Sequence, residues 1–138
     1  MKIFIDTNIF LDLILEREEH ADHAEQLLIW CANGNITGIT SAVSLVNVYY
    51  VASRHKSKTE AKKVIRKLLS FVEIAETNHK DLLLALDSEF ADFEDAVQYQ
   101  TSLNSPGVKY IITRNKKDFK LSNIPALTAE EFIAKIEQ

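Results

Sequence analysis

Three aspartates in this sequence are suited to holding a divalent cation. Asp6 follows a short apolar run, Asp95 lies in the segment DFEDAVQ, and Asp118 lies in the polar segment RNKKDF. Carboxylate oxygens are hard ligands of the kind that Mg²⁺ and Mn²⁺ prefer, and these ions take only a few carboxylates from a protein. The residue types therefore favour a magnesium or manganese site, provided that the fold brings the three aspartates together.

The apolar pattern predicts strands that alternate with helices and so place these residues. Strands are predicted at residues 2–5, 36–40, 72–75 and 108–113, with a short fifth strand before Thr128. Helices are predicted at residues 9–14, 21–33, 42–54, 58–71, 79–90, from 92 to 104, and after a capping box at Thr128 and Glu131. This alternation predicts an α/β fold, in which helices cover both faces of a mostly parallel sheet of about five strands.

Asp6 and Asp95 each admit a structural and a functional interpretation. In parallel sheets the functional crevice lies beyond the carboxyl ends of the strands, where Asp6 is expected. Asn8 is better placed to cap the following helix, which favours a functional Asp6. Asp92 has the position of a helix N-cap, and the helix dipole alone accounts for an acid at Asp95, so only the company of the other acids favours a functional Asp95.

Oxygen-bearing side chains also surround the predicted crevice. Thr113, Asn115 and Asp118 follow the strand at residues 108–113. In the helix at residues 42–54, Asn47 shares a face with Val43, Tyr50 and Val51 and interrupts an apolar stripe. From its spacing alone, Asn47 is interpreted as a buried amide with hydrogen-bond partners in the core.

The composition limits the class of protein. With 138 residues and 46% hydrophobic residues, the chain suits one globular domain over residues 1–138. A net charge of −4 argues against a strongly basic nucleic-acid coat protein but not against a nuclease. The basic stretch at residues 54–67 suits phosphate contact or, more plainly, a solvated helix face.

Cysteine usage and the N-terminus predict a cytoplasmic protein. Cys31 is the only cysteine, so no intrachain disulfide is possible, and its apolar neighbours favour a place in the core. The N-terminus reaches a charge too early for a signal peptide, and no apolar run approaches membrane-spanning length. His20 and His23 have a spacing that zinc accepts, although a solvated helix start is the simpler interpretation.

Taken together, these segments make the chain resemble the PIN-domain family, especially the toxins of bacterial VapBC-type toxin–antitoxin pairs. The resemblance covers nearly the whole chain. It rests on IFIDTNIFLDL, SAVSLVNVYYV, DFEDAVQ and YIITRNKKDF, in that order. It implies a PIN-like (Rossmann-like) three-layer α/β/α fold and a Mg²⁺- or Mn²⁺-dependent ribonuclease, often a homodimer, inhibited by a cognate antitoxin.

The resemblance also implies roles for individual residues. Asp6, Asp95 and Asp118 would hold one or two metal ions that activate water for in-line attack at phosphorus. Arg114 or Lys116 would stabilise phosphate charge. The residues expected to support this site are Asn47, Asp92, Thr113 and Asn115.

Other interpretations remain open at this point. The family commonly has Glu where Asn47 stands and often Asp where Asn115 stands, so a PIN-like module that binds RNA or a protein without cleaving is the main alternative. A phosphate-accepting receiver domain needs an acidic pair after the first strand, and a phosphatase with an aspartate nucleophile needs an acid where Asn8 stands. Both fit the sequence poorly.

Overall fold

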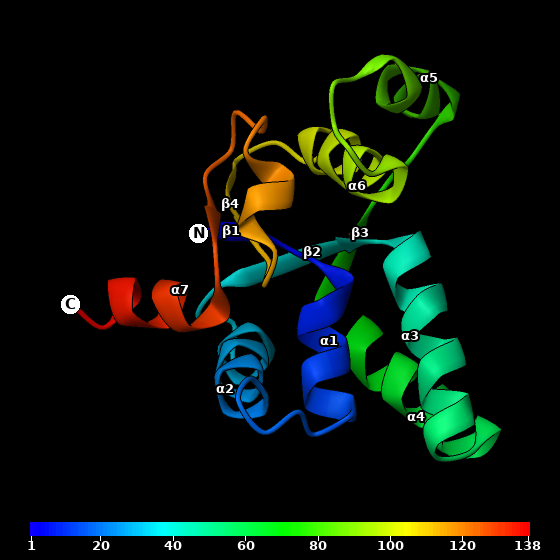
Figure 1. The fold of residues 1–138 in the computed structure, drawn as a ribbon. Coiled ribbons are helices and arrows are strands. Elements are labelled where there is room, and N and C mark those ends of the chain that lie inside the picture. Colours follow the sequence, from blue (N-terminus) through cyan, green and yellow to red (C-terminus); the bar gives the residue numbers. More distant parts are fainter.

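The computed structural model describes residues 1–138 as five strands, seven α-helices and one short 3₁₀ helix (Figure 1). The strands are β1 (Lys2–Ile5), β2 (Thr37–Ser41), β3 (Val72–Ala75), β4 (Val108–Ile112) and β5 (Ala126–Leu127). The helices are α1 (Thr7–Ile14), α2 (Ala21–Ala32), α3 (Ala42–His55), α4 (Lys58–Leu69), α5 (His79–Asp87), α6 (Phe93–Leu103), the 3₁₀ helix η1 (Lys116–Phe119) and α7 (Ala129–Ile136).

All five strands are parallel and form one sheet in the order β3-β2-β1-β4-β5. The first strand of the chain therefore lies in the middle of the sheet. Ile3 of β1 pairs with Gly38 of β2 on one side and with Tyr110 of β4 on the other. Because the strands are parallel, the carboxyl ends of β1, β2 and β4 meet at one edge, as the sequence predicted.

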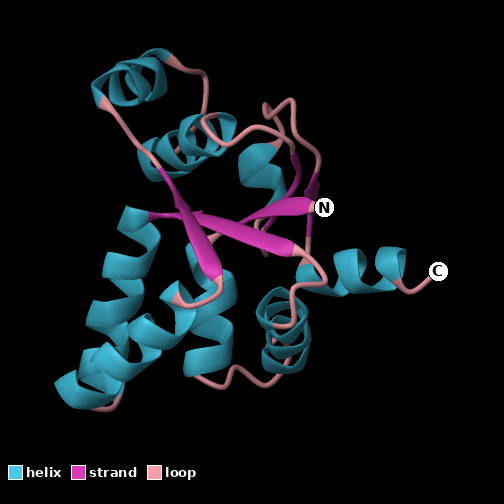
Figure 2. Ribbon diagram, turned by 180° about the vertical axis from the view of Figure 1, so that it is seen from behind, coloured by secondary structure: helices cyan, strands magenta, loops and turns pink.

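Helices cover both faces of the sheet, which confirms the predicted three-layer α/β/α architecture (Figure 2). Side chains alternate between the faces along each strand. Ile5 of β1 and Ile112 of β4 belong to a large core with α1, α2, α3, α4 and α7. Phe4 and Ile111 point the other way, into a smaller core with α6 and η1. Helix α5 packs on α6 rather than on the sheet (Figure 1).

Gly38 allows α2 to approach β2 closely. A Cβ at this position would lie 2.8 Å from Sγ of Cys31 and 2.9 Å from Cδ1 of Ile5, so any larger residue would force these side chains to move. Cys31 is buried in the main core, as predicted, and burial raises the pKa of its thiol to about 12. Its thiol is therefore a packing group, not a nucleophile.

Most predicted elements are present, but two expectations about helices were wrong. Helix α5 ends at Asp87 instead of continuing to residue 90, and Ser88 there caps the helix in extended conformation. The predicted apolar stripe of α3 is not its buried face, because Val43 and Tyr50 are 44% and 53% exposed. The buried face of α3 consists of Ser44, Leu45, Val48 and Ala52. No helix combines the length and the apolar character needed to cross a membrane.

Candidate active site

Asp6 lies where β1 ends and α1 begins, and it is only 6% exposed. Its Oδ1 accepts a hydrogen bond from the backbone N–H of Thr7 at 2.8 Å, and its Oδ2 accepts one from the hydroxyl of Thr113 at 2.8 Å. Asp6 is thus itself the N-cap of α1, and the expectation that Asn8 serves this purpose was wrong, since Asn8 lies inside the helix. The cap fixes the carboxylate at the carboxyl edge of the sheet.

A buried network of hydroxyl and amide groups surrounds Asp6. The hydroxyl of Thr7 donates to Oγ of Ser44 at 2.7 Å, and the hydroxyl of Ser41 lies 3.1 Å from the same oxygen. Nε2 of Gln98 donates to Oγ of Ser44 at 2.6 Å and lies 3.5 Å from Oγ1 of Thr7. These contacts join the first turns of α1 and α3 to the middle of α6.

The start of α6 brings further acids to the same edge. Asp92 is the N-cap, as predicted, and accepts a hydrogen bond from the backbone N–H of Asp95 at 3.0 Å. Burial, followed by repulsion from Asp92, Asp6, Asp118 and Glu94, raises the pKa of Asp95 to about 7. Burial, then Asp6 and Asp92, also raises the pKa of Glu94. The acids are therefore close enough to disfavour one another's charge.

The segment after β4 contributes from the opposite side. Thr113 is fully buried, donates to Asp6 and accepts the backbone N–H of Asn115 at 3.0 Å. The segment predicted as a polar loop forms the 3₁₀ helix η1, which carries Asp118. Burial raises the pKa of Asp6, the hydrogen bonds from Thr113 and Thr7 and the nearby amide of Gln98 oppose that rise, and the charge of Asp118 adds to it.

The acidic side chains share one electrostatic neighbourhood without forming a complete metal cage. No three Asp, Glu, His or Cys side chains are arranged as a ready set of metal ligands. The available donors are nevertheless oxygens from three different parts of the chain, around Asp6, Asp95 and Asp118. A cation that keeps several waters suits such a set better than one that needs a closed protein cage.

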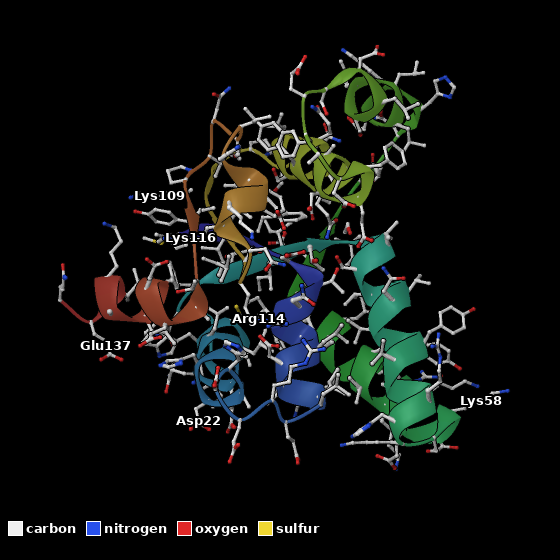
Figure 3. All side chains as sticks on the ribbon, viewed as in Figure 1. Asp22, Lys58, Lys109, Arg114, Lys116 and Glu137 are labelled. Carbon is white, nitrogen blue, oxygen red and sulfur yellow. The ribbon has the colours of Figure 1, made fainter.

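The predicted phosphate-contacting cations both have carboxylate partners within the chain. Nζ of Lys116 lies 2.9 Å from Oε2 of Glu131 on α7. Nε of Arg114 lies 3.0 Å from Oδ2 of Asp12 on α1, but its N–H makes no directed hydrogen bond, so the contact is an ion pair only. Figure 3 shows Arg114 beside α1. Arg17 also binds Asp12, at 3.0 Å from Oδ1.

The remaining predicted residues lie in less constrained positions. Asn47 is half-buried on α3, one turn after Ser44, and so lies at the border of the buried network instead of deep in the core. Asn115 is exposed and precedes η1. His20 and His23 lie at the start of α2 beside a small cavity of about 110 Å³ that Asp12 also lines.

Sequence reasoning missed four polar groups that the structure places at this edge: Thr7, Ser44, Glu94 and Gln98. Gln98 follows Asp95 by three residues, and Ser44 follows Ser41, the N-cap of α3, by three. A search for polar residues one helical turn beyond each candidate would have found both. Asp12, which is 1% exposed and binds two arginines, carried no signal that set it apart from a surface acid.

Comparison with known proteins places these features in a family. A family model of the PIN domain matches residues 2–117. Ribonuclease VapC1 of Aquifex aeolicus (strain VF5) is 31% identical over 136 residues, which cover 95% of this chain and 92% of that protein.

Two solved structures that resemble this chain are toxin–antitoxin complexes. A toxin–antitoxin complex from Klebsiella pneumoniae is 26% identical with a TM-score of 0.65, and the match covers 92% of this chain and 97% of that one. VapBC2 from Rickettsia felis, bound to a DNA fragment from its promoter, is 20% identical with a TM-score of 0.67 and covers 93% and 98%. The sequence match over most of the chain, together with the fold, shows that the protein belongs to the PIN-domain family.

Proposed function

We propose that this chain is a divalent-metal-dependent endoribonuclease and the toxin of a type II toxin–antitoxin pair. The observation that carries the proposal is the gathering of mutually repelling carboxylates where β1, α6 and η1 meet. The relative from Aquifex aeolicus is named as a ribonuclease, which supports the same activity here. Clustered acids destabilise a protein without cations, and a bound cation would remove that repulsion.

The residues fit a hard divalent cation. All the candidate donors are carboxylate, hydroxyl or amide oxygens, which are the ligands that these cations prefer. We propose that Asp6, Asp95 and Asp118 hold Mg²⁺ or Mn²⁺, with Asp92, Thr113, Asn115 and Asn47 in supporting positions. When bound, such an ion supplies a more acidic water and neutralises charge that develops on a phosphate.

The chain's own side chains prepare this chemistry. The N–H of Thr7 and the hydroxyl of Thr113 hold both oxygens of Asp6 in fixed directions, so the carboxylate needs no reorganisation when a cation arrives. Lys116 is exposed, and its surface ion pair with Glu131 is cheap to exchange for an RNA phosphate. Arg114 is held more firmly by the buried Asp12, so Lys116 is the better candidate for that contact.

Cleavage of a structured RNA tests the proposal. The wild-type chain should cleave it with Mn²⁺ or Mg²⁺ and stop when a chelator is added. Asp6→Asn should abolish cleavage, while Asp87→Asn, an exposed change on α5, should not alter it. Cleavage that persists in chelator or in Asp6→Asn would refute the assignment. RNA binding without any cleavage would instead favour the non-cleaving module, which Asn47 and Asn115 motivate.

An apolar groove supports the proposed antitoxin partner. The groove has a volume of about 510 Å³ between α1, α2 and α4, and its apolar lining includes Phe10, Ile29 and Val64. Its charged lining residues are three lysines and two glutamates, Lys56, Lys63, Lys67, Glu16 and Glu25, so positive charge is in slight excess. This combination suits an amphipathic antitoxin helix with acidic residues beside its apolar face. The complex from Klebsiella pneumoniae, at 26% identity, is consistent with such a partner.

Co-purification with the product of the adjacent reading frame tests this partner. Ile29 is 43% exposed and lines the groove, so Ile29→Arg should prevent complex formation without unfolding the chain. Leu121→Arg, at a similarly exposed position outside the groove, is the matched control. Equal loss of the complex in both variants would show that the groove is not the docking site.

A second apolar surface supports a homodimer. A cleft of about 410 Å³ between α3, α4 and β3 is lined only by hydrophobic residues, among them the exposed Val46, Tyr50 and Leu69. A surface without charge suits an identical apolar surface in a second copy. Light scattering after gel filtration should report a dimer that Val46→Glu converts to a monomer. A wild-type monomer at all accessible concentrations would refute the dimer.

A further inference from the structure

Gln98 is the most deeply buried amide of the candidate site. It projects from α6, one helical turn after Asp95, and is only 1% exposed. Its Nε2 donates to Oγ of Ser44 at 2.6 Å and reaches Oγ1 of Thr7 at 3.5 Å. The donor end of this amide therefore faces the residues that follow β1 and β2.

The contacts of Gln98 lead directly to Asp6. Thr7 is the next residue in the chain, and its backbone N–H holds Oδ1 of Asp6 at 2.8 Å. The Thr7 hydroxyl is hydrogen-bonded to Oγ of Ser44, and the Gln98 amide donates a hydrogen bond to the same oxygen. One amide from α6 thus fixes the first turns of α1 and α3, and with them the direction of the Asp6 carboxylate.

Stability alone does not account for a glutamine at this position. Its Oε1 is buried and no protein group donates to it, which costs folding free energy that a methionine of similar length would avoid. Without the amide, the hydroxyls of Thr7, Ser41 and Ser44 would still bond to one another. What only the glutamine supplies is a donor directed at the carboxylate side of the network.

We propose that Gln98 is a positioning residue for Asp6. Its amide holds the Asp6 carboxylate in the direction needed to bind a divalent cation. This inference rests on the proposed metal-dependent function. It extends the site to a residue that touches neither the cation nor the RNA. Groups that orient a metal ligand from behind typically change metal affinity by 10–100-fold when they are removed.

Calorimetric titration with Mn²⁺ alone, paired with thermal unfolding in chelator, tests the inference on the intact chain. Gln98→Met should weaken Mn²⁺ binding by about tenfold or more. Its unfolding temperature without metal should equal or exceed that of the wild type. Gln100→Met, a half-buried glutamine of the same helix outside the network, should change neither measurement. Raising the Mn²⁺ concentration should restore RNA cleavage to Gln98→Met.

A second variant keeps the test decisive if Gln98→Met folds poorly. Ser44→Ala removes the acceptor of the amide with a minimal change in volume and should also weaken Mn²⁺ binding. Equal Mn²⁺ affinity in the wild type, Gln98→Met and Ser44→Ala, with wild-type cleavage intact, would overturn the positioning role but leave the proposed function standing. A wild-type chain that neither binds Mn²⁺ nor cleaves RNA would overturn both.

Discussion

Replacing Asp95 by asparagine should stabilise the metal-free protein while abolishing its nuclease activity. The pKa of Asp95 is raised from 3.8 to about 7, first by burial and then by Asp92, Asp6, Asp118 and Glu94. The native state therefore holds the proton more tightly than the unfolded state. Ionisation of the Asp95 carboxylate therefore destabilises the native state. This loss of stability is absent below pH 3.8, grows as the pH rises, and is complete above about pH 7.

The size of this effect follows from the same numbers. One pH unit corresponds to about 1.4 kcal/mol, so the full interval from 3.8 to about 7 would represent about 4 kcal/mol. Asp95 is only partly buried, and solvent screening reduces this to roughly 1–2 kcal/mol. For a chain of this length, that gain should raise Tm by roughly 3–8 °C.

Urea and thermal unfolding in chelator at pH 8.0 and pH 4.5 would measure the change. Asp95→Asn should exceed the wild type in unfolding free energy at pH 8.0, and the difference should shrink at pH 4.5. Added Mn²⁺ should stabilise the wild type more than the variant, because the cation removes the same repulsion. Asp87→Asn, exposed on α5, is the control. A variant less stable than the wild type at pH 8.0 would show that the acids are not crowded as described.

Two further substitutions test the partners of the buried carboxylates Asp6 and Asp12. Thr113→Val removes the hydroxyl that donates to Asp6, so we expect the free energy of unfolding at pH 8.0 to fall by about 1–3 kcal/mol. The loss should be smaller in acid, where Asp6 is protonated. Urea unfolding at the two pH values measures the difference. Asp12→Asn leaves Arg17 and Arg114 without their buried anion and should lower the free energy of unfolding at pH 7 by about 1–3 kcal/mol. Urea unfolding measures this change as well. An unchanged midpoint would mean that these ion pairs contribute nothing to stability.

The fold was predictable because its signals are local. Ser41, Ser57 and Thr128 cap their helices with hydrogen bonds to the third residue beyond, as short polar side chains before helical periodicity predict. Strand β3 has the bounds predicted for it. The parallel sheet then follows from alternation alone, which is why residues far apart in the chain could be assigned to one edge.

The candidate site was only partly predictable, because its decisive contacts are not local. Gln98 bonds to residues 54 and 91 positions away in the chain, and no spacing rule connects them. The error at Asn8 has a different origin: the cap is a local contact between Asp6 and the adjacent Thr7, and Asp6 serves as cap and as candidate ligand at once. The prediction that the face of α3 with Val43 and Tyr50 is buried was wrong because helical spacing identifies residues that share a face but not which face is buried.

The central position of β1 has a consequence for the order of events during protein synthesis. The residues of β1 leave the ribosome before those of β4, which is its neighbour in the sheet, and before Thr113 and Asp118, which follow β4. The surroundings of Asp6 are therefore complete only after the residues up to Asp118 have been synthesised. If the chain is the ribonuclease that we propose, a nascent toxin remains harmless to the messenger being translated until the segment after β4 has emerged.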